Sequence, residues 1–393
     1  MIATLGYAVD LFDLILFSLL RVQSLKDLNV ADITGVGVDL INAQMAGLMV
    51  GGVFWGVLGD KRGRLSVLLG SILLYSVANL GNAFVATVPQ YAAMRFIAGI
   101  GLAGELGAGV TIVSEILPQR IRGYGSTIIT AIGVFGAVGA AFVANTVPWR
   151  HAYILGGVLG IVLLAMRLGI RESHLFSKLE SSSVSRGELR AFLRRPDMIR
   201  RVGLVVLTGV PIWFVIGVLV TFTPEFAKAL SIPGEQPKVT NAIMFLYLGL
   251  SVGGAGVGVL SQWLQSRRHA LLASLLATSA LLVFYRPLAG ASMTAYYAMC
   301  FAFGVSAGYW AMFVQIAAEQ FGTNFRATVT TSVPNLVRGS TIPMTMAFKG
   351  LIPGLGVIGS GLTVGFTVLG IAILATWLLE ETFHRELDYY ERV

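Results

Sequence analysis

Charged residues are scarce in this chain. Aspartate, glutamate, lysine and arginine make up 12% of its 393 residues, about half their share in a soluble domain. Hydrophobic residues make up 55% and occur in long runs, which places the chain in a membrane. Its net charge of +8 does not indicate nucleic-acid binding, because the basic residues lie in short segments between the apolar runs, where they set the orientation of membrane helices.

Cysteine, histidine and phosphate-binding motifs are equally rare. Cys300 is the single cysteine, which excludes a disulfide within the chain. The four histidines lie in or beside expected loops without the spacing of metal ligands. The sequence has no P-loop motif, which argues against ATP as the direct energy source. We therefore expect no metal and no cofactor. We also expect no enzyme, since no nucleophile and base converge in the membrane.

Twelve apolar segments are long enough to cross a bilayer, whose hydrocarbon core of about 30 Å needs roughly 20 residues of helix. The first begins at Ile2 without the basic start of a signal peptide and carries two aspartates, so we expect it to be retained. The expected spans are residues 2–20, 41–59, 65–87, 90–117, 123–146, 149–168, 203–228, 239–263, 269–285, 293–320, 326–348 and 354–379.

A polar segment rich in arginine and serine separates the two halves. We expect a six-helix bundle over residues 1–168, a basic linker over 169–202 and a second six-helix bundle over 203–393. Lysine and arginine are concentrated in the loops on the side of this linker and of both termini, which places that side in the cytoplasm. The expected location is a bacterial inner (plasma) membrane.

The chain is duplicated. Four glycines recur 202 residues later, so that Gly47, Gly51, Gly52 and Gly56 return as Gly249, Gly253, Gly254 and Gly258. Transporters built from repeats place their site between the repeats. Glycines at this spacing allow two helix backbones to approach closely, and the pattern leaves open whether they serve plain packing or sliding of the two helices.

The run that follows the first glycine set is a charged turn, GVLGDKRGR at 56–64. It resembles the signature loop G-x-L-x-D-[RK]-x-G-[RK] of the major facilitator superfamily at every fixed position. The resemblance implies an all-α membrane fold of twelve helices in two six-helix bundles related by a pseudo-two-fold axis. In the second half Gln262 replaces the aspartate, which leaves open whether an ion pair forms there. The gating residues implied are Gly56, Asp60, Arg62, Gly63, Arg64, Glu115 and Arg122, with Glu319 and Arg326 as their echo in the second half.

A second resemblance concerns the branch of the family. The run RFIAGIGLAGELG at 95–107 is similar to the R-x-x-x-G-x-x-x-G-G-E-x-G helix of metabolite:proton symporters, with Ala103 in place of one glycine. The D-x-x-D start at 10–13 resembles that of acid and sugar-acid symporters, and the helix is also close to that of sialic-acid carriers. These resemblances imply symport of an organic acid, a sugar acid or a betaine with protons.

Ionisable residues inside apolar segments need a physical reason. A central aspartate costs roughly 2.5–3.5 kcal/mol on insertion scales, so it persists only with a partner, with water or as the protonated acid. Asp10 and Asp13 share one helix face, and mutual repulsion favours the uptake of a proton by one of them. They are candidates for proton coupling, and the alternatives are a structural bridge to Arg95 or a place near the aqueous end of the helix. Arg95 and Glu105 are further candidates; they lie roughly 15 Å apart along a helix, so each should find its partner on another helix.

Arg338 is the candidate for substrate binding. It has no basic counterpart in the first half, and a guanidinium in a low-dielectric cavity binds a carboxylate well. It is equally open that Arg338 pairs with Asp10 or Asp13. Aromatic side chains at helical spacing belong to a core more often than to a ligand surface, and the same alternative holds here. The other candidates for substrate contact are Asn335, Tyr309, Trp310, Gln315, Trp213 and Gln44.

These features predict a secondary active transporter that moves a small polar metabolite (an organic anion, a sugar acid or a zwitterion) by proton-coupled alternating access. The alternative is a uniporter or a proton-antiport exporter of the same fold for a cationic or amphipathic compound. In the first hypothesis the substrate binds between Arg95, Glu105 and Arg338. The expected partners are this substrate, protons and the lipid bilayer, with no nucleic acid, and the fold implies a monomer.

Overall fold

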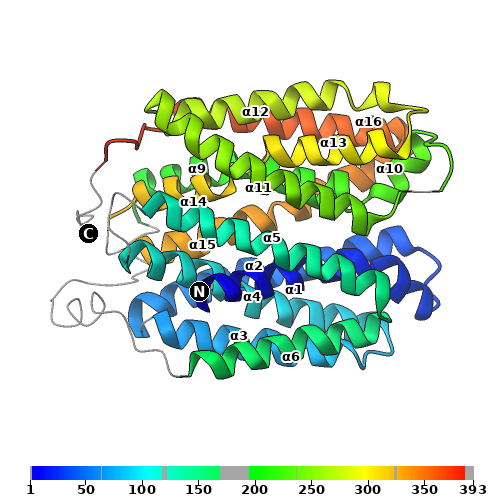
Figure 1. Cartoon of the computed structure of the whole chain (residues 1–393), viewed down its shortest axis with the longest axis horizontal. Helices are drawn as coiled ribbons and strands as arrows, with labels where there is room; N and C mark the ends of the chain where they lie inside the picture. The colour runs from blue at the N-terminus through cyan, green and yellow to red at the C-terminus, as the bar shows by residue number, and fades with distance from the viewer. Residues whose placement is uncertain are drawn as a thin grey trace.

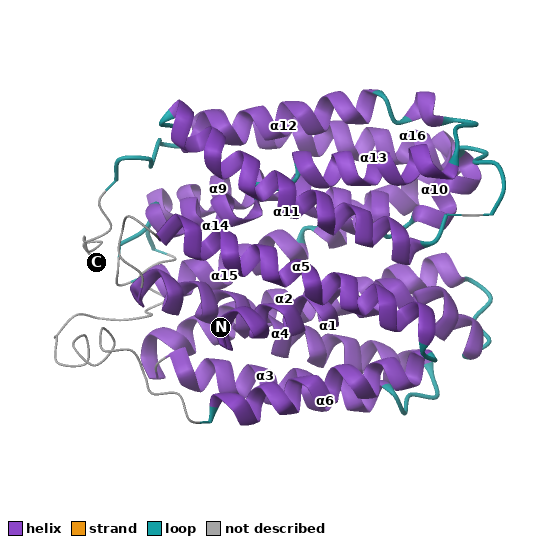
Figure 2. Ribbon diagram, in the orientation of Figure 1, coloured by secondary structure: helices purple, strands orange, loops and turns teal. Residues whose placement is uncertain are grey.

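The structure is a computed structural model that describes residues 2–62, 64–116, 122–168, 194–235, 237–322 and 325–385. Side chains are described in these ranges except at residues 2–4, 60, 64, 106–132, 134, 326 and 327. All regular elements in the described part are helices, and most of them run side by side along the long axis of the molecule (Figures 1 and 2).

The first half contributes six helices, each composed of apolar residues over most of its length. Within this half α2 packs on α4, α3 packs on α4 and α6, and α1 packs on α5. The bounds are α1 Ile2–Asp27, α2 Ile33–Arg62, α3 Arg64–Asn82, α4 Val88–Ile116, α5 Arg122–Thr146 and α6 Trp149–Arg167.

The second half is more broken. Within it α11 packs on α13, and α16 packs on α9 and α12. The two halves meet mainly where α15 contacts α2 and α4, and where α11 contacts α5. The bounds are α9 Pro196–Phe214, the π-helix η1 Val215–Val220, α10 Thr223–Ala229, α11 Val239–Leu264, α12 Arg267–Val283, the short η2 Arg286–Leu288, α13 Met293–Ser306, α14 Trp310–Glu319, α15 Arg326–Gly339 and α16 Thr341–Leu378.

Three of the helices expected to be continuous are interrupted. The span expected at 203–228 divides into α9, η1 and α10, with Pro211 inside α9, where proline removes a backbone hydrogen bond. The span expected at 293–320 divides into α13 and α14, and the one at 326–348 is interrupted between α15 and α16. Inside α16 the non-helical backbone of Gly356 (φ 66°) separates two helical stretches, close to the expected start of the last span. The 20-residue ruler could not show these breaks, because it counts the length of a segment and not the course of the backbone within it.

The surface and a few buried side chains differ from those of a soluble protein, although the core is hydrophobic. Large apolar side chains such as Phe84, Phe135 and Trp377 are exposed, whereas the largest fully buried side chains include four arginines: Arg21, Arg95, Arg167 and Arg338. Seven segments of the described chain are long and apolar enough to cross a membrane: 33–59, 65–82, 149–167, 196–220, 239–264, 293–319 and 328–378. The count of twelve spans and the domain boundaries stay predictions.

The duplicated glycines serve helix packing in both halves. A Cβ on Gly47 would lie 2.1 Å from the Phe96 carbonyl oxygen of α4, and a Cβ on Gly249 would lie 2.2 Å from the Phe301 carbonyl oxygen of α13. Gly51 and Gly253 repeat this contact one turn further along. The first two glycines of each set therefore let α2 pack on α4, and α11 on α13, at a distance that only glycine allows.

Candidate functional site

A cavity lies between the two halves at the broken helices. About 450 Å³ of space, which includes open solvent, lies between its walls. Helices α1, α9, η1, α11 and α14 and the end of α15 contribute to its wall. The lining residues are Tyr7, Leu11, Ile212, Trp213, Ile216, Tyr247, Leu250, Gly308, Trp310 and Arg338.

The helix breaks explain why the chain can form this wall. Gly308 lies in the turn between α13 and α14, and a Cβ there would come within 2.4 Å of the Gly253 carbonyl carbon of α11. The chain therefore passes α11 at van der Waals distance and turns Trp310 into the cavity. Interrupted helices surrounding a central site are typical of transporters.

Among the described residues that line the cavity, Arg338 is the one that carries a charge. It is 1% exposed, and its guanidinium carbon lies 5.8 Å from the ring centres of both Trp213 and Trp310, within cation–π range. Its Nη1 donates to Asn335 Oδ1 at 3.2 Å, and its Nη2 lies 3.6 Å from Asp10 Oδ2. The sequence left open whether Arg338 binds a substrate or pairs with Asp10 or Asp13. In the structure its acidic partner is Asp10, and the side chain also faces the cavity.

Asn335 holds this arginine instead of lining the cavity. Its side-chain amide donates to the Ala103 carbonyl oxygen of α4 at 2.9 Å and to the Thr331 carbonyl oxygen at 2.8 Å. The amide oxygen is thereby turned toward Arg338. Asn335 connects the second half to the first directly beside the cavity.

Asp10 is fully buried on α1 one turn after Tyr7. Neither carboxylate oxygen accepts a hydrogen bond from the described residues. Behind it lies a second pair, Arg167 Nη2 with Glu105 Oε1 at 2.7 Å, both about 2% exposed. Gly6 makes room for that pair, because a Cβ there would lie 1.8 Å from Arg167 Nη2.

Asp13 and Arg95 form a separate unit on the side of α1 that faces α6. Asp13 is fully buried next to Gly156 and accepts no hydrogen bond in the described part. Arg95 attracts it electrostatically, while Asp10 repels it. Arg95 itself donates to Asn79 Oδ1 at 2.8 Å and Asn82 Oδ1 at 3.3 Å, and lies over the ring of Tyr153. As expected, Arg95 and Glu105 take partners on other helices.

Three of the candidates for substrate contact are engaged away from the cavity. The Tyr309 hydroxyl donates to the Thr208 carbonyl oxygen at 3.0 Å, and Gln315 donates to Glu319 at 2.8 Å. Gln44 donates to the Leu14 carbonyl oxygen at 3.2 Å. The candidates that do line the cavity are Arg338, Trp213 and Trp310.

Sequence analysis missed several residues of this region. Tyr7 lies one helical turn before Asp10 and shares its face, which is a usable signal. Tyr247 carries no such signal, because nothing in the sequence shows how α11 is rotated. Arg167 lies at the very end of the expected span 149–168, and the structure buries it at the end of α6. Arg21 lies just beyond the expected span 2–20, but α1 continues to Asp27 and buries it.

The two ends of the molecule differ in their contacts. We call the end where α6 ends and α9 begins the linker end, and the end where α1 ends and α2 begins the far end. At the far end Arg21 Nη2 meets Glu225 Oε1 at 3.0 Å, and the Thr34 hydroxyl donates to the same oxygen at 3.1 Å. Two further bonds join the halves there, Thr240 to Asn145 and Thr345 to Asn42. Contacts between the halves therefore lie on the far-end side of the cavity.

Contacts between the halves also lie on the linker side of the cavity. The Ser332 hydroxyl donates to the Gly52 carbonyl oxygen at 3.3 Å, and Gly56 lies against Thr328 of α15. Of the gating residues, Gly63 and the side chains of Asp60, Arg64, Glu115, Arg122 and Arg326 lie outside the described residues, and Arg62 is exposed. In the second half, Glu319 pairs with Arg267 at 3.6 Å, so an ion pair does form there without the missing aspartate.

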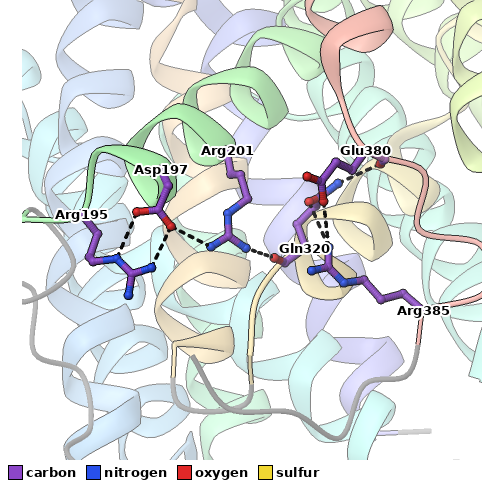
Figure 3. A network of polar contacts seen from close by, with 6 residues as sticks. All are labelled: Arg195, Asp197, Arg201, Gln320, Glu380 and Arg385. Carbon is purple, nitrogen blue, oxygen red and sulfur yellow. Dashed lines mark hydrogen bonds and ion pairs between the residues drawn. The ribbon is translucent and has the colours of Figure 1, made fainter. Parts of the chain in front are cut away.

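A polar network at the linker end fastens the second half (Figure 3). Arg201 connects Asp197 at 3.5 Å with the Gln320 carbonyl oxygen at 2.8 Å, and Gln320 donates to the Glu380 carbonyl oxygen at 3.0 Å. Arg195 and Arg385 complete it through Asp197 and Glu380. The start of α9, the end of α14 and the segment after α16 are thereby joined.

Comparison with known proteins gives a family and a fold. The profile of the family described as Major Facilitator Superfamily matches residues 3–339. The 3-(3-hydroxy-phenyl)propionate transporter of Escherichia coli is 27% identical over 85% of this chain and 83% of its own length. The gentisate transporter of Corynebacterium glutamicum is 24% identical over 81% of this chain and 73% of its own.

Among solved structures, a proton:xylose symporter bound to 6-bromo-6-deoxy-D-glucose matches with a TM-score of 0.74 at 17% identity, covering 98% of this chain and 96% of that chain. The matches confirm the expected all-α fold of the Major Facilitator Superfamily and the likeness to carriers of organic acids. The roles expected for single site residues stay predictions.

Proposed function

Because the chain belongs to the Major Facilitator Superfamily, we propose that it carries a small aromatic carboxylate across the membrane together with protons. Membership makes the chain an integral membrane transporter and not an enzyme. The coupling to protons and the aromatic substrate are the proposal.

The observation that carries the proposal is Arg338. It is a buried guanidinium, and the other described residues of the cavity wall are uncharged. A carboxylate can accept two parallel hydrogen bonds from such a group, which fixes its orientation as well as its position. The proposal therefore assigns the carboxylate of the substrate to Arg338.

The rest of the wall favours a ring. Four aromatic residues, Tyr7, Trp213, Tyr247 and Trp310, surround the space in front of Arg338. Aromatic rings pack on such surfaces in stacked or edge-on arrangements. The two relatives described above are named as transporters of gentisate and of 3-(3-hydroxy-phenyl)propionate. Both compounds are carboxylates with one aromatic ring, which supports the same choice over a sugar acid or a betaine.

The energetics set what protons can contribute. One proton moving down about 100 mV releases roughly 2.3 kcal/mol, and one pH unit adds about 1.4 kcal/mol. A monocarboxylate that moves with one proton carries no net charge, so the membrane potential cancels and only the pH gradient drives it. We propose accordingly that accumulation follows the pH difference, about tenfold per unit.

Orientation and domain boundaries belong to the same proposal. We propose six-helix bundles over 1–168 and 203–393 that rock about the cavity, with the linker 169–202 and both termini in the cytoplasm of a bacterial cell. The alternative is a uniporter or exporter of the same fold, in which the buried acids bind a cationic compound.

Uptake into proteoliposomes tests the proposal. Radiolabelled benzoate, 3-phenylpropionate and gentisate are offered with an imposed pH gradient, with an imposed potential alone, and with both collapsed by an uncoupler. We expect accumulation of at least one acid with the pH gradient and none with the potential alone. Accumulation that survives the uncoupler would exclude symport, and transport of cations but no acid would favour the alternative.

A further inference from the structure

We infer that Asp10 and the carboxylate of the substrate compete for Arg338, so that one proton is taken up on Asp10 for each carboxylate bound. This inference rests on the proposed function and adds to it the acid that couples and the stoichiometry.

The Arg338 guanidinium has two possible anionic partners, Asp10 and the carboxylate of the substrate. Asp10 approaches Nη2 of Arg338 from α1, and Asn335 occupies Nη1 from α15. The Nε of Arg338 has no hydrogen-bond partner among the described residues. The indole rings of Trp213 and Trp310 both lie near the guanidinium, so it cannot turn freely toward a new partner. A substrate carboxylate that enters from the cavity must therefore share Nη2 with Asp10 or displace it.

The charges of the site balance only without a substrate. Asp10 neutralises Arg338, and Glu105 neutralises Arg167. A bound carboxylate adds one negative charge in a buried place, which is costly unless it is compensated. A proton on Asp10 restores neutrality and releases Arg338 to the substrate.

The groups around Asp10 offer no better site for that proton. Glu105 has a direct ion pair at 2.7 Å, and Asp10 is held at 3.6 Å and accepts no hydrogen bond. Among the described residues, the charged groups that act electrostatically on Asp10 are Arg338, Glu105 and Arg167. Asp10 in turn acts on Tyr7, Asp13, Tyr75 and Tyr247.

Asp13 is the matched control within the same helix. It is equally buried and equally without hydrogen bonds. It faces Gly156 and the Arg95 unit and does not line the cavity. A substrate at Arg338 does not displace Asp13 from its cation, so its removal should leave the proton uptake that accompanies binding unchanged.

The test is calorimetric titration of the purified carrier with benzoate and with benzamide, its neutral analogue. Binding is measured from pH 5.5 to 8.5, in two buffers of different ionisation enthalpy at each pH. For the wild type we expect proton uptake that approaches one per benzoate toward the alkaline end of this range, where Asp10 of the free carrier is ionised, and there a Kd that rises about tenfold per pH unit. Benzamide should bind without proton uptake and with little pH dependence, a comparison that needs no variant.

The variants decide between the two acids. In Asp10→Asn we expect benzoate to bind without proton uptake, with a Kd that no longer depends on pH, whereas Asp13→Asn keeps both wild-type responses. Proton uptake that persists in Asp10→Asn, or that benzamide causes as well, overturns the inference alone. If benzoate, 3-phenylpropionate and gentisate all fail to bind the wild type at every pH, the proposed function falls together with the inference.

Discussion

At the scale of single residues, the protein depends on small side chains placed beside buried charges. Gly6 borders the Glu105–Arg167 pair, and Gly156 borders Asp13. A buried ion pair requires close geometry, because breaking it leaves an uncompensated charge that costs several kcal/mol. The two glycines are therefore part of the charged site although they have no chemistry of their own.

Gly6→Ala tests this dependence. The added methyl would lie 1.8 Å from Arg167 Nη2 and 2.2 Å from Glu105 Oε1, so α1 must shift or the ion pair must open. We expect destabilisation by about 1–3 kcal/mol, seen as a lower thermal midpoint. The control is Gly139→Ala on α5, where a Cβ meets nothing within 4 Å; equal midpoints for the two variants would contradict the expectation.

At the scale of elements, ion pairs and hydrogen bonds hold the ends of several helices in place. The far end is held by Arg21 of α1, which is fully buried between Glu225 of α10 and the ring of Phe222. Since α10 continues the chain from η1, which lines the cavity through Ile216, this ion pair connects the cavity wall to the closure of the far end.

Glu225→Ala should open the far end. The substitution leaves Arg21 without its acidic partner, and the closed arrangement loses a bond between the halves. In a Cys300→Ser background, we expect a cysteine placed at residue 345 to react faster with a membrane-impermeant thiol reagent. Asp27→Ala is the control, because its partner Arg150 (3.5 Å) lies in the same half; if both variants accelerate labelling equally, Arg21 and Glu225 do not act as a latch.

A second fastening lies outside the membrane-spanning segments, at the start of α12. The Glu381 carboxylate accepts hydrogen bonds from the backbone N–H groups of Arg267 at 2.9 Å and Arg268 at 3.2 Å, and from the Ser266 hydroxyl. Burial raises the pKa of Glu381, but these bonds and one from the Phe383 N–H outweigh it and hold the pKa below its usual value.

The depressed pKa of Glu381 predicts a stability that depends on pH. Its contribution is fully present above the unfolded pKa of about 4.3 and is lost as the pH falls through the lower folded value. Glu381→Gln should therefore lower the free energy of unfolding at pH 7 by less than about 1 kcal/mol at this partly exposed site, seen as a lower thermal midpoint. The difference should vanish at strongly acidic pH. A pH series of thermal melts measures this, and a difference that grows on acidification would show the opposite sign.

At the scale of the whole molecule, the duplicated glycines have diverged between the halves. A Cβ on Gly56 would lie 3.2 Å from the Thr328 carbonyl oxygen of the other half. A Cβ on its counterpart Gly258 would meet nothing within 4 Å. The same sequence position therefore serves contact between the halves in one copy and is free in the other. Alternating access requires such contacts to break at one end at a time.

The pair Gly56→Leu and Gly258→Leu uses this divergence. Leucine at 56 should push α2 away from α15 and favour the state open at the linker end, by about 1–3 kcal/mol or 5–150-fold in population. We expect slower uptake and faster thiol labelling of a cysteine at residue 332, again in the Cys300→Ser background. Gly258→Leu should leave both rates unchanged; equal loss in the two variants would point to a general effect on folding.

The sequence by itself determined the membrane class, the duplication and some of the ionisable residues that the interior keeps, among them Asp10, Asp13, Arg95, Glu105 and Arg338, because hydropathy and repeat spacing are local properties of the chain. It also showed that Arg95 and Glu105 are too far apart along one helix to pair. The tertiary structure alone decided that Arg338 faces Asp10, that Glu105 takes Arg167, and that Tyr247 lines the cavity while Tyr309 turns away. These outcomes depend on the rotation and crossing of helices far apart in the sequence and on breaks inside the membrane segments, which no local pattern records.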